Sequence, residues 1–416
     1  MTSPSPADEA LLETVQRQTF RYFWEFGHPV SGLARDRHDP HDARGDDVCT
    51  IGGTGFAVMA IIVAAERGWI TRAEALARLR TIAGFLAAAD HYHGIFPHFM
   101  HGGTGRTIRF SRKDDGADIV ETSLLIAGLL CARHYFDGDS AGERALRGII
   151  QQLWLEAEWN WHTRGGRELL YWHWSPNHGW AMGHEIRGWN ECLITYLLAA
   201  ASPTFPVDPE VYHRGWANGR EFVNGREFFG TRLPLGPDLG GPLFFAHYSF
   251  MGLDPRGLRD RYADYWEQNV RHTRINHDYC VANPRGFAGY GPDCWGLTAS
   301  DDHAGYVAHA PNEDTGVISP TAAISSLPYL PEEAMRAMRH FHGPLGERIW
   351  RDYGFTDGFS VGHDWYARTH LAIDQGPIVV MIENFRSGLM WRLFMQAPEI
   401  HEGLRRLGFQ SPHLVA

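Results

Sequence analysis

The feature that most constrains the fold is the repetition, along the whole chain, of apolar segments with helical spacing. Loops rich in Gly, Pro and Asn separate these segments, and no low-complexity linker interrupts them. Segments with this period bury one face against a core and favour helices. We expect helices over residues 7–26, 53–67, 72–89, 117–136, 141–160, 184–201, 241–252, 258–280, 319–326, 331–352 and 373–395.

This set of helices predicts a single all-α domain over residues 1–416, with a short flexible N-terminal segment of about residues 1–8. Paired helices can close into an (α/α)6 toroid with long loops forming a cleft at one end, or they can pack as a large bundle. The pattern alone does not separate these two architectures. Strand-like alternation is scarce and no Gly-rich phosphate loop follows a strand, which argues against a Rossmann or P-loop domain.

Charge and composition narrow the class of partner. The chain has 49 acidic and 38 basic residues and a formal net charge of −11, which disfavours binding to nucleic acid. The longest apolar stretches, such as residues 57–65, are too short to cross a membrane, and the first residues do not resemble a signal peptide. We therefore expect a soluble cytoplasmic protein, or a periplasmic one if a leader has been removed. The 13% aromatic content and 24 histidines fit a neutral polar ligand such as a sugar.

Cysteine and histidine spacing argues against a bound metal. Five cysteines without a C-x-x-C pair fit neither a disulfide framework nor a thiolate zinc site. The run HYHGIFPHFMH groups four histidines, but it lacks H-E-x-x-H spacing and its centre indicates a loop. Hydroxyl recognition or surface exposure explains them better than zinc, so we expect no metal and no cofactor. The four are His91, His93, His98 and His101.

Tryptophan is concentrated in residues 154–189, where His and Asn interrupt seven Trp residues. Aromatic rings beside polar groups are common in ligand sites. Large side chains of this kind can also fill the wide centre of a helical ring. The sequence leaves both interpretations open.

Three acids precede or begin a predicted helix in SRKDDGADIVETSLLIAGLL. Asp114, Asp118 and Glu121 stand at i, i+4 and i+7, which places them on one helical face if the helix begins early enough. Three like charges on one face raise at least one pKa or require partners. Capping and the helix dipole also favour acids at a helix start, although Glu121 lies further inside the apolar run.

Glu191 begins the apolar run of HEIRGWNECLITYLLAA, directly after Trp189 and Asn190. A carboxyl group against an indole ring in a partly dry site has a raised pKa, the state that a general acid needs. The alternative is an acid in the first turn of a helix, stabilised by the helix dipole.

A further pair of acids lies in LAIDQGPIVVMIENFRSGLMW. Asp374 starts the last long apolar helix, and Glu383 lies inside it. A glutamate within an apolar run needs a partner. Arg386 or Arg392 could form an ion pair with Glu383, or Glu383 could bind a ligand.

Several runs together resemble one known family. The chain resembles the endo-β-1,2-glucanases of glycoside hydrolase family 144, within the wider glucoamylase-like group. The runs that carry the resemblance are the two helical runs just quoted, GGPLFFAHYSFMGLDPRGLRDRYADYWEQNV, CWGLTASDD, SPTAAISSLPYLPEEAM and YWHWSPNHGW. The similarity extends over about residues 17–399, and ordered similarity over several runs is far more specific than a short motif.

The resemblance implies an (α/α)6 barrel that hydrolyses β-1,2-glucan with inversion and releases sophorose and short β-1,2-gluco-oligosaccharides. The family's D-x-x-x-D-x-x-E block corresponds here to Asp114, Asp118 and Glu121, and its WNE block gives Glu191, our candidate general acid. Asp374 is the candidate base. Further contacts with the substrate are expected from Trp172, Trp174, Trp180, Trp189, His247, Tyr248, Trp295, Asp301 and Glu383.

The family leaves other activities open. Members often carry an export signal, which this sequence does not begin with. An exo-acting β-1,2-glucosidase or sophorohydrolase, a transglycosylase and a non-catalytic glucan-binding protein are alternatives, as is a sugar epimerase on a similar helical barrel. Endo or exo action, oligomeric state and calcium binding at residues 301–302 are not decided by the sequence.

Overall fold

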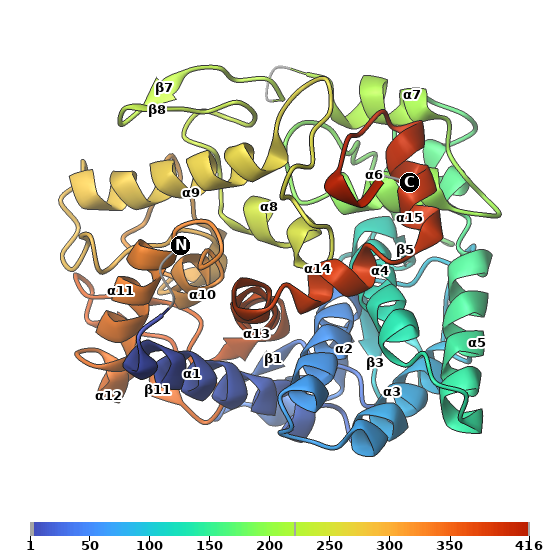
Figure 1. Ribbon diagram of the computed structural model, residues 1–416, viewed down its shortest axis with the longest axis horizontal. Helices are drawn as coiled ribbons and strands as arrows, with labels where there is room; N and C mark the ends of the chain where they lie inside the picture. Colours follow the sequence, from blue (N-terminus) through green and yellow to red (C-terminus); the bar gives the residue numbers. More distant parts are fainter. Residues whose placement is uncertain (1–3, 220–221, 415–416) are drawn as a thin grey trace.

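The computed structural model describes residues 4–219 and 222–414, and it is built from pairs of helices (Figure 1). In each pair an outer helix leads into an inner helix, and six such pairs follow one another along the chain. The outer helices are α1 (Pro6–Glu25), α3 (Arg72–Leu86), α5 (Ala141–Glu156), α7 (Pro209–Val211), α9 (Tyr265–Ala282) and α11 (Pro331–His342). The inner helices are α2 (Ile51–Glu66), α4 (Ile119–Tyr135), α6 (Leu193–Ala201), α8 (Phe244–His247), α10 (Pro320–Ile324) and α13 (Ala372–Arg386).

The inner helices form a closed ring. Helix α2 packs between α4 and α13, α4 packs on α6, and α10 packs on α13. Helix α6 contacts the 3-10 turn Ser249–Met251, which continues α8. The hydroxyl of Tyr329, just after α10, donates to the Ala246 carbonyl at 3.0 Å and completes the ring. This order confirms the expected (α/α)6 toroid rather than a bundle.

Burial explains why the two sets of helices differ in sequence. Helix α2 is apolar on every side and has 14 buried residues, because both faces meet other helices. The outer helix α11 buries only the face that carries residues such as Met338 and Phe341. Helices α1 and α13 lie side by side although they come from opposite ends of the sequence (Figure 1).

Helices α2 and α4 approach each other at two glycines. A Cβ on Gly55 would lie 2.2 Å from the Leu124 carbonyl oxygen, and a Cβ on Gly128 would lie 2.2 Å from the Gly55 carbonyl oxygen. Side chains at these two positions would therefore push the helices apart. This close contact fixes the start of α4 beside the start of α2.

The long connections all lie at one end of the ring. Those that lead into the inner helices cover residues 26–50, 87–118, 157–192, 217–219 with 222–243, 283–319 and 343–371, whereas return connections such as 67–71 and 136–140 are short. Because outer and inner helices alternate in direction, the long loops gather at the N-terminal ends of the inner helices. The long loops at one end of the ring, expected from the sequence, are therefore present.

Short antiparallel strands stiffen these loops. Strands β2 (Val48–Thr50), β3 (Phe99–His101) and β4 (Thr107–Ile108) form a three-stranded sheet, and the remaining strands pair in twos. Strand β1 pairs with β15 and joins the first long loop to the last. The pairs are β1 (Arg37–His38) with β15 (His370–Leu371), β5 (Ala117–Asp118) with β6 (His173–Trp174), β7 (Glu227–Phe228) with β8 (Thr231–Arg232), β9 (Ala299–Asp302) with β10 (Gly305–Ala308), β11 (Trp350–Arg351) with β12 (Gly354–Phe355), and β13 (Phe359–Ser360) with β14 (Trp365–Tyr366).

Several predicted helices were too long. The segment 184–192 is a loop, bent where Gly188 has a φ of 79°, so α6 begins only at Leu193. The segment 331–352 ends α11 at His342, forms the short α12 (Gly346–Ile349) and becomes strand β11. Gly388, with a φ of 66°, separates α13 from α14 (Leu389–Phe394). Positive φ stops a helix, which apolar periodicity does not reveal.

The two ends of the chain also differ from expectation. Residues 6–8, which we included in a flexible segment, form the first turn of α1, where the Ser5 hydroxyl caps the Asp8 amide at 3.2 Å; residues 1–3 lie outside the described part. Helix α15 (Pro398–Arg406) was not predicted, and it packs on α6.

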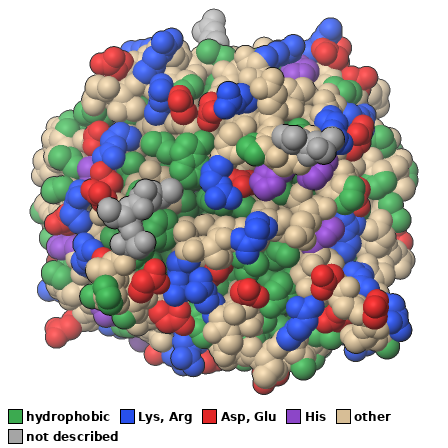
Figure 2. All heavy atoms as spheres, in the orientation of Figure 1, with side chains coloured by type: hydrophobic (Ala, Val, Ile, Leu, Met, Phe, Trp, Pro, Cys, Tyr) green, Lys and Arg blue, Asp and Glu red, His purple; other side chains and the backbone are tan. Residues whose placement is uncertain are grey.

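Two further properties concern the surface. No helix in the described residues is long and apolar enough to cross a membrane. The face seen in Figure 2 intersperses acidic and basic side chains among apolar ones, without a large patch of either charge.

Candidate active site

The predicted acids lie at the N-terminal ends of three inner helices. Asp118 caps α4, and its Oδ1 accepts hydrogen bonds from the Val120 and Glu121 amides at 3.0 Å each. Asp374 lies in the first turn of α13, and Glu191 lies two residues before α6. Helix N-termini carry a partial positive charge that favours carboxylates, which explains why acids gather here.

The acids of the first block do not share one helical face, as the spacing suggested. Helix α4 begins at Ile119, so Asp118 is its cap and Asp114 lies in a turn before strand β5. Only Glu121 is helical. Tertiary contacts nevertheless bring Asp114 and Asp118 together, because both contact His173.

Two histidines pair with these aspartates. His173 stands opposite Asp118 in the β5–β6 register, and its Nδ1 lies 3.2 Å from Oδ2 of Asp114 and 3.7 Å from Oδ2 of Asp118. Nδ1 of His98 lies 3.0 Å from Oδ2 of Asp118. Burial opposes the charge on His98, but the charges of Glu121, Asp118 and Asp114 outweigh it and raise the pKa of His98 to about 9.

The ligating atoms of Asp114, Asp118 and His173 lie within 4.8 Å of one another, a spacing that a metal ion also requires. His173 lies within ion-pair distance of both carboxylates, although its enclosed Nδ1 forms no hydrogen bond with either. Of the four histidines in the HYHGIFPHFMH run, His98 is the one that pairs with these acids. His93 instead stacks on Trp161, with 3.8 Å between ring centroids, and pairs with Glu158.

Glu121 is anchored to the start of the neighbouring inner helix. Its Oε2 accepts hydrogen bonds from the Gly52 amide at 2.6 Å and from the Thr50 hydroxyl at 3.1 Å. A Cβ on Gly52 would lie 2.8 Å from the same oxygen, so a side chain at this position would displace the carboxylate. Burial raises the pKa of Glu121, and the charge of Asp118 raises it further.

Glu191 is the acid without a side-chain partner among the described residues. Its backbone carbonyl accepts a hydrogen bond from the Ser249 hydroxyl, which also accepts from the Ile194 amide at 3.0 Å and so fixes the turn. The side chain is half-buried. Burial, followed by the charges of Asp118 and Glu121, raises the pKa of Glu191 to about 7. A carboxyl group with this pKa is protonated in a large fraction of molecules near neutral pH.

Asp374 belongs to a second buried cluster, separate from the cluster around Asp118. Asp357 interacts with Asp374, and Oδ2 of Asp357 accepts a hydrogen bond from the Asp301 amide at 2.6 Å. Asp301 in turn forms an ion pair with Arg37 of strand β1. Burial raises the pKa of Asp374 well above its usual range, and the charges of Asp357 and Asp301 raise it further.

Tyr248 connects the two clusters. Burial raises the pKa of its hydroxyl, and the charges of Asp374, Glu191 and Glu121 raise it further. Acids on three inner helices or their entry turns therefore lie close enough to Tyr248 for their charges to act on its hydroxyl. Tyr248 is half-buried and rests on Phe56 of α2, with 5.3 Å between ring centroids.

The predicted aromatic contacts divide between the site and the core. Trp172 precedes His173, stacks on His184 with 4.9 Å between centroids, and has an enclosed indole N–H without a partner. Trp174 follows His173 in strand β6 and contacts Tyr92, with 6.2 Å between ring centroids. Trp180 packs on Tyr171 at 5.8 Å.

Three other predicted contacts are enclosed in the core. Trp189 is buried among aromatic rings that include Trp216. Trp295 is fully buried, and its indole N–H donates to the Glu333 carbonyl at 3.4 Å. His247 is buried, and its Nε2 lies 2.9 Å from the Ser326 hydroxyl. These three side chains therefore pack in the core, and their contact with substrate stays a prediction.

Glu383 has a structural partner, but not either of the two that we expected. Its carboxylate forms two hydrogen bonds with Arg67, at 2.8 and 2.9 Å, and accepts a third from Gln16. Arg386 pairs instead with Glu13. The sequence could not reveal this, because Arg67 and Glu383 are joined only by the closure of the ring.

Sequence reasoning missed several residues of the site. His173 stands between two tryptophans, in a run that indicates aromatic content and the family but not an acid's partner. Asp357 lies in the connection that leads into α13 and Arg37 lies in strand β1, and neither has a spacing that relates it to Asp374. Arg37 reaches this cluster through the pairing of the first and last long loops.

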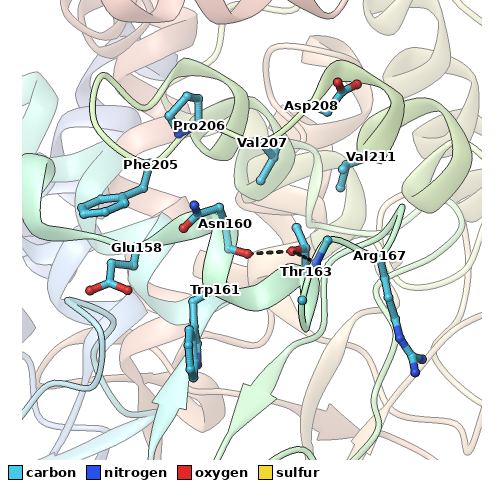
Figure 3. A pocket seen from close by; sticks show the side chains of 12 residues that line it. Glu158, Asn160, Trp161, Thr163, Arg167, Phe205, Pro206, Val207, Asp208 and Val211 are labelled. Carbon is cyan, nitrogen blue, oxygen red and sulfur yellow. Dashed lines mark hydrogen bonds between the residues drawn. The ribbon is translucent and has the colours of Figure 1, made fainter.

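A separate hollow of about 500 Å³ lies between the turn 159–163 and residues 205–211 (Figure 3). Trp161, Phe205 and Val211 contribute apolar surface to it, while Glu158 and Arg167 contribute charge. None of the predicted acids lines it. It is therefore distinct from the acid site.

The comparisons with known proteins agree with this geometry. Residues 183–398 match the Glycoamylase family, described as "Putative glucoamylase". A crystal structure from Bacteroides uniformis with the same description is 56% identical, with all of both chains covered and a TM-score of 0.96. The endo-β-1,2-glucanase of Chitinophaga pinensis, solved with sophorotriose and glucose, is 50% identical over 99% of this chain and 100% of that one, also with a TM-score of 0.96.

A curated relative from Parabacteroides distasonis is an exo-β-1,2-glucooligosaccharide sophorohydrolase that acts at the non-reducing end. It is 42% identical over 96% of this chain, which spans 58% of the relative's length. The family match covers more than half of the chain, and the identities extend over nearly all of it. The chain therefore belongs to the glucoamylase-like family of glycoside hydrolases, the family that includes the β-1,2-glucanases, and the resemblance read from its sequence is confirmed.

Proposed function

We propose that this protein is an endo-acting glycoside hydrolase that cleaves β-1,2-glucan with inversion at the anomeric carbon. Its products would be sophorose and short β-1,2-gluco-oligosaccharides. The observation that carries the proposal is the state of Glu191, a half-buried carboxyl group with a pKa raised to about 7 and no side-chain partner among the described residues. Such a group holds a proton near neutral pH and can donate it to a glycosidic oxygen.

Inversion also requires an ionised carboxylate that activates water on the opposite side of the sugar. The two carboxyl groups of inverting glycosidases stand roughly 6.5–9.5 Å apart, which leaves room for that water. We assign this role to Asp374, because it lies on another inner helix and shares with Glu191 the space around Tyr248. Glu191 protonates the leaving oxygen while Asp374 accepts the proton of the attacking water.

The cluster around Asp118 has a different role in this proposal. Asp118 already accepts hydrogen bonds from two backbone amides and contacts His98, so it is not free to exchange protons with a substrate. Its pKa is lowered, because the hydrogen bond and charges of His98 and His173 outweigh burial. We propose that Asp114, Asp118 and Glu121 stay charged or hydrogen-bonded, orient sugar hydroxyls, and keep the proton on Glu191.

Endo action is supported by the relative that matches this chain over its full length, the endo-β-1,2-glucanase of Chitinophaga pinensis. One observation favours an exo-acting sophorohydrolase instead, namely the 42% identity with the Parabacteroides distasonis protein. That protein is longer, and this chain corresponds to only part of it. The sizes of the first products from long linear β-1,2-glucan distinguish the two activities. A series of oligosaccharides indicates endo cleavage, and sophorose alone indicates exo cleavage.

The first experiment compares glucans that differ only in linkage. We expect new reducing ends from β-1,2-glucan and none from starch, and NMR of the first product to show the α-anomer, as inversion requires. Cleavage of starch alone would contradict the substrate. A β-anomer would indicate a retaining transglycosylase or hydrolase. Absence of new reducing ends after long incubation would favour a glucan-binding protein.

A substitution tests the assigned acid. In Glu191→Gln we expect kcat on β-1,2-glucan to fall by about 10²–10⁴-fold, because the amide cannot donate the required proton. Binding of short oligosaccharides, measured by calorimetry, should remain detectable. Glu168→Gln, at an exposed position in the same long loop, is the matched control and should keep its turnover. Unchanged turnover in Glu191→Gln would reject the assignment.

A further inference from the structure

The cluster on the Asp374 side contains a contact that the mechanism has not used. Oδ2 of Asp374 and Oδ1 of Asp357 are both enclosed, and neither accepts a hydrogen bond from any donor in the described residues. Each residue is 2% exposed. The two side chains interact directly with each other. Two ionised carboxylates offer each other only acceptors, so such a contact is unfavourable unless a proton lies between them.

We propose, on the basis of the function proposed above, that Asp357 is a positioning residue that holds Asp374 through one proton shared between Oδ1 of Asp357 and Oδ2 of Asp374. The shared proton satisfies both orphaned oxygens at once. It also fixes the rotamer of Asp374 and leaves its other oxygen, Oδ1, which is not among the enclosed orphans, to face the water that attacks the sugar.

The surroundings hold Asp357 in place for this role. Its Oδ2 accepts from the Asp301 amide at 2.6 Å, and its own amide donates to the Thr369 carbonyl at 3.0 Å. The Thr369 hydroxyl donates to the Asp301 carboxylate, which also binds Arg37. Asp357 is therefore fixed at one oxygen by the backbone of strand β9 and presents the other to Asp374.

The other titratable groups around the pair leave one proton as the favourable state. Arg37 supplies one positive charge, and Asp301 already forms an ion pair with it. The pair therefore lies among further negative or neutral groups rather than beside a second cation. Besides Asp301 and Arg37, the described groups on which the charge of the pair acts are Tyr22, Tyr248 and Tyr306.

The proton balance of hydrolysis fits such a pair. Before the reaction the pair carries one proton and one negative charge. As the water oxygen attacks the anomeric carbon, Oδ1 of Asp374 accepts the water proton and the shared proton moves fully to Asp357. The pair is then neutral with two protons, and Glu191, which has given its proton to the leaving oxygen, is ionised. The pair releases one proton to solvent and Glu191 takes one up, so both return to their starting state without net release of a proton. Asp357 thus relieves Asp374 of a proton without contacting the substrate.

The direct test is a carboxyl titration of the intact protein that contains ¹³C-labelled aspartate, followed by NMR. In the wild type we expect two coupled carboxyl transitions, one of them above pH 6, that disappear together in Asp374→Asn. In Asp357→Asn only one transition should remain, more than about one pH unit below the upper wild-type transition, because the like charge is removed. Independent, ordinary titration of both carboxyl groups in the wild type would overturn the proposal, and this reading does not require any variant to fold.

The pH profile of kcat/KM separates positioning from a merely structural role. Because the working pair holds one proton, the acid limb reports uptake of the second. In Asp357→Asn it should move to higher pH, since an amide stabilises the Asp374 carboxylate less than the shared carboxyl proton does, whereas the alkaline limb, set by Glu191, should stay. Asp314→Asn is the control, since Asp314 is equally buried but pairs with Tyr279 and Tyr290. Its acid limb should not move. An unmoved acid limb in Asp357→Asn would contradict the proposal.

The two proposals fail differently. If the wild type leaves β-1,2-glucan uncut, the proposed function falls, but the NMR titration still decides whether the proton is shared. If the wild type cleaves the glucan and the titration shows two independent carboxyl groups, the function stands and the positioning role of Asp357 falls.

Discussion

At the scale of single residues, Glu191 is placed where its charge is costly. Burial and two neighbouring acids raise its pKa from the usual range of a glutamate to about 7. Asp118, whose charge acts on Glu191, has a lowered pKa because two backbone amides and His98 stabilise its charge. Neighbouring carboxyl groups with opposite shifts can divide the roles of proton donor and fixed charge.

A stability measurement follows from this cost. A raised pKa means that the contribution of Glu191 to stability is fully present below the unfolded value near 4.5 and is lost as the pH rises through about 7. Glu191→Gln cannot ionise, so above pH 7 it should be more stable than the wild type by about 1–3 kcal/mol. The difference should shrink toward zero near pH 4. Urea unfolding at several pH values measures it, and a constant difference would contradict the assigned burial of the charge.

At the scale of the elements, the inner helices place the acids through their N-terminal ends. The contact between α2 and α4 matters most, because the Thr50–Gly52 turn that holds Glu121 begins α2 while Asp118 caps α4. Gly55 and Gly128 allow the two backbones to touch. The register of one helix on the other therefore determines where the carboxylates lie.

We predict that Gly128→Ala destabilises the protein although alanine favours helices. The added Cβ would lie 2.2 Å from the Gly55 carbonyl oxygen, and such overpacking costs about 1–3 kcal/mol or more. Gly148→Ala in the outer helix α5 has nothing within 4 Å and should be neutral or stabilise by up to about 1 kcal/mol. Thermal unfolding of both variants checks the prediction. Equal Tm values for the two variants would show that the helices can separate at little cost.

At the scale of the whole molecule, the ring must close between the first and last helices. Glu383 of α13 binds Arg67, just after α2, and Gln16 of α1. The β1–β15 pairing makes a second closure at the loop end, where it brings Arg37 to Asp301. Closure at both ends holds Asp374 in the ring opposite Glu191.

The closure can be tested by Glu383→Gln. This change leaves the Arg67 guanidinium without its charged partner, and breaking a buried pair in this way costs about 3–5 kcal/mol. We expect a lower Tm with an unchanged KM for β-1,2-gluco-oligosaccharides at a temperature where the variant is folded. A raised KM with an unchanged Tm would instead support the role in ligand binding that the sequence suggested for Glu383.

The chain's local pattern determined its helices and the class of its acids, because apolar periodicity and family-like runs are properties of neighbouring residues. Helical segments, the Gly-, Pro- and Asn-rich loops between them, and the candidates Asp118, Glu121 and Glu191 were all visible in this way. The ends of the helices were less visible in the sequence, because Gly188 and Gly388 stop helices through backbone angles that periodicity does not encode.

The tertiary structure alone decided which of these acids meet and which partners set their protonation. His173 reaches Asp114 through a strand pair, Asp357 meets Asp374 where the last long loop folds back on the start of α13, and Glu383 binds Arg67 rather than Arg386. The physical reason is that a pKa depends on distance and burial in space, and a closed ring brings together charges that are hundreds of residues apart in the sequence.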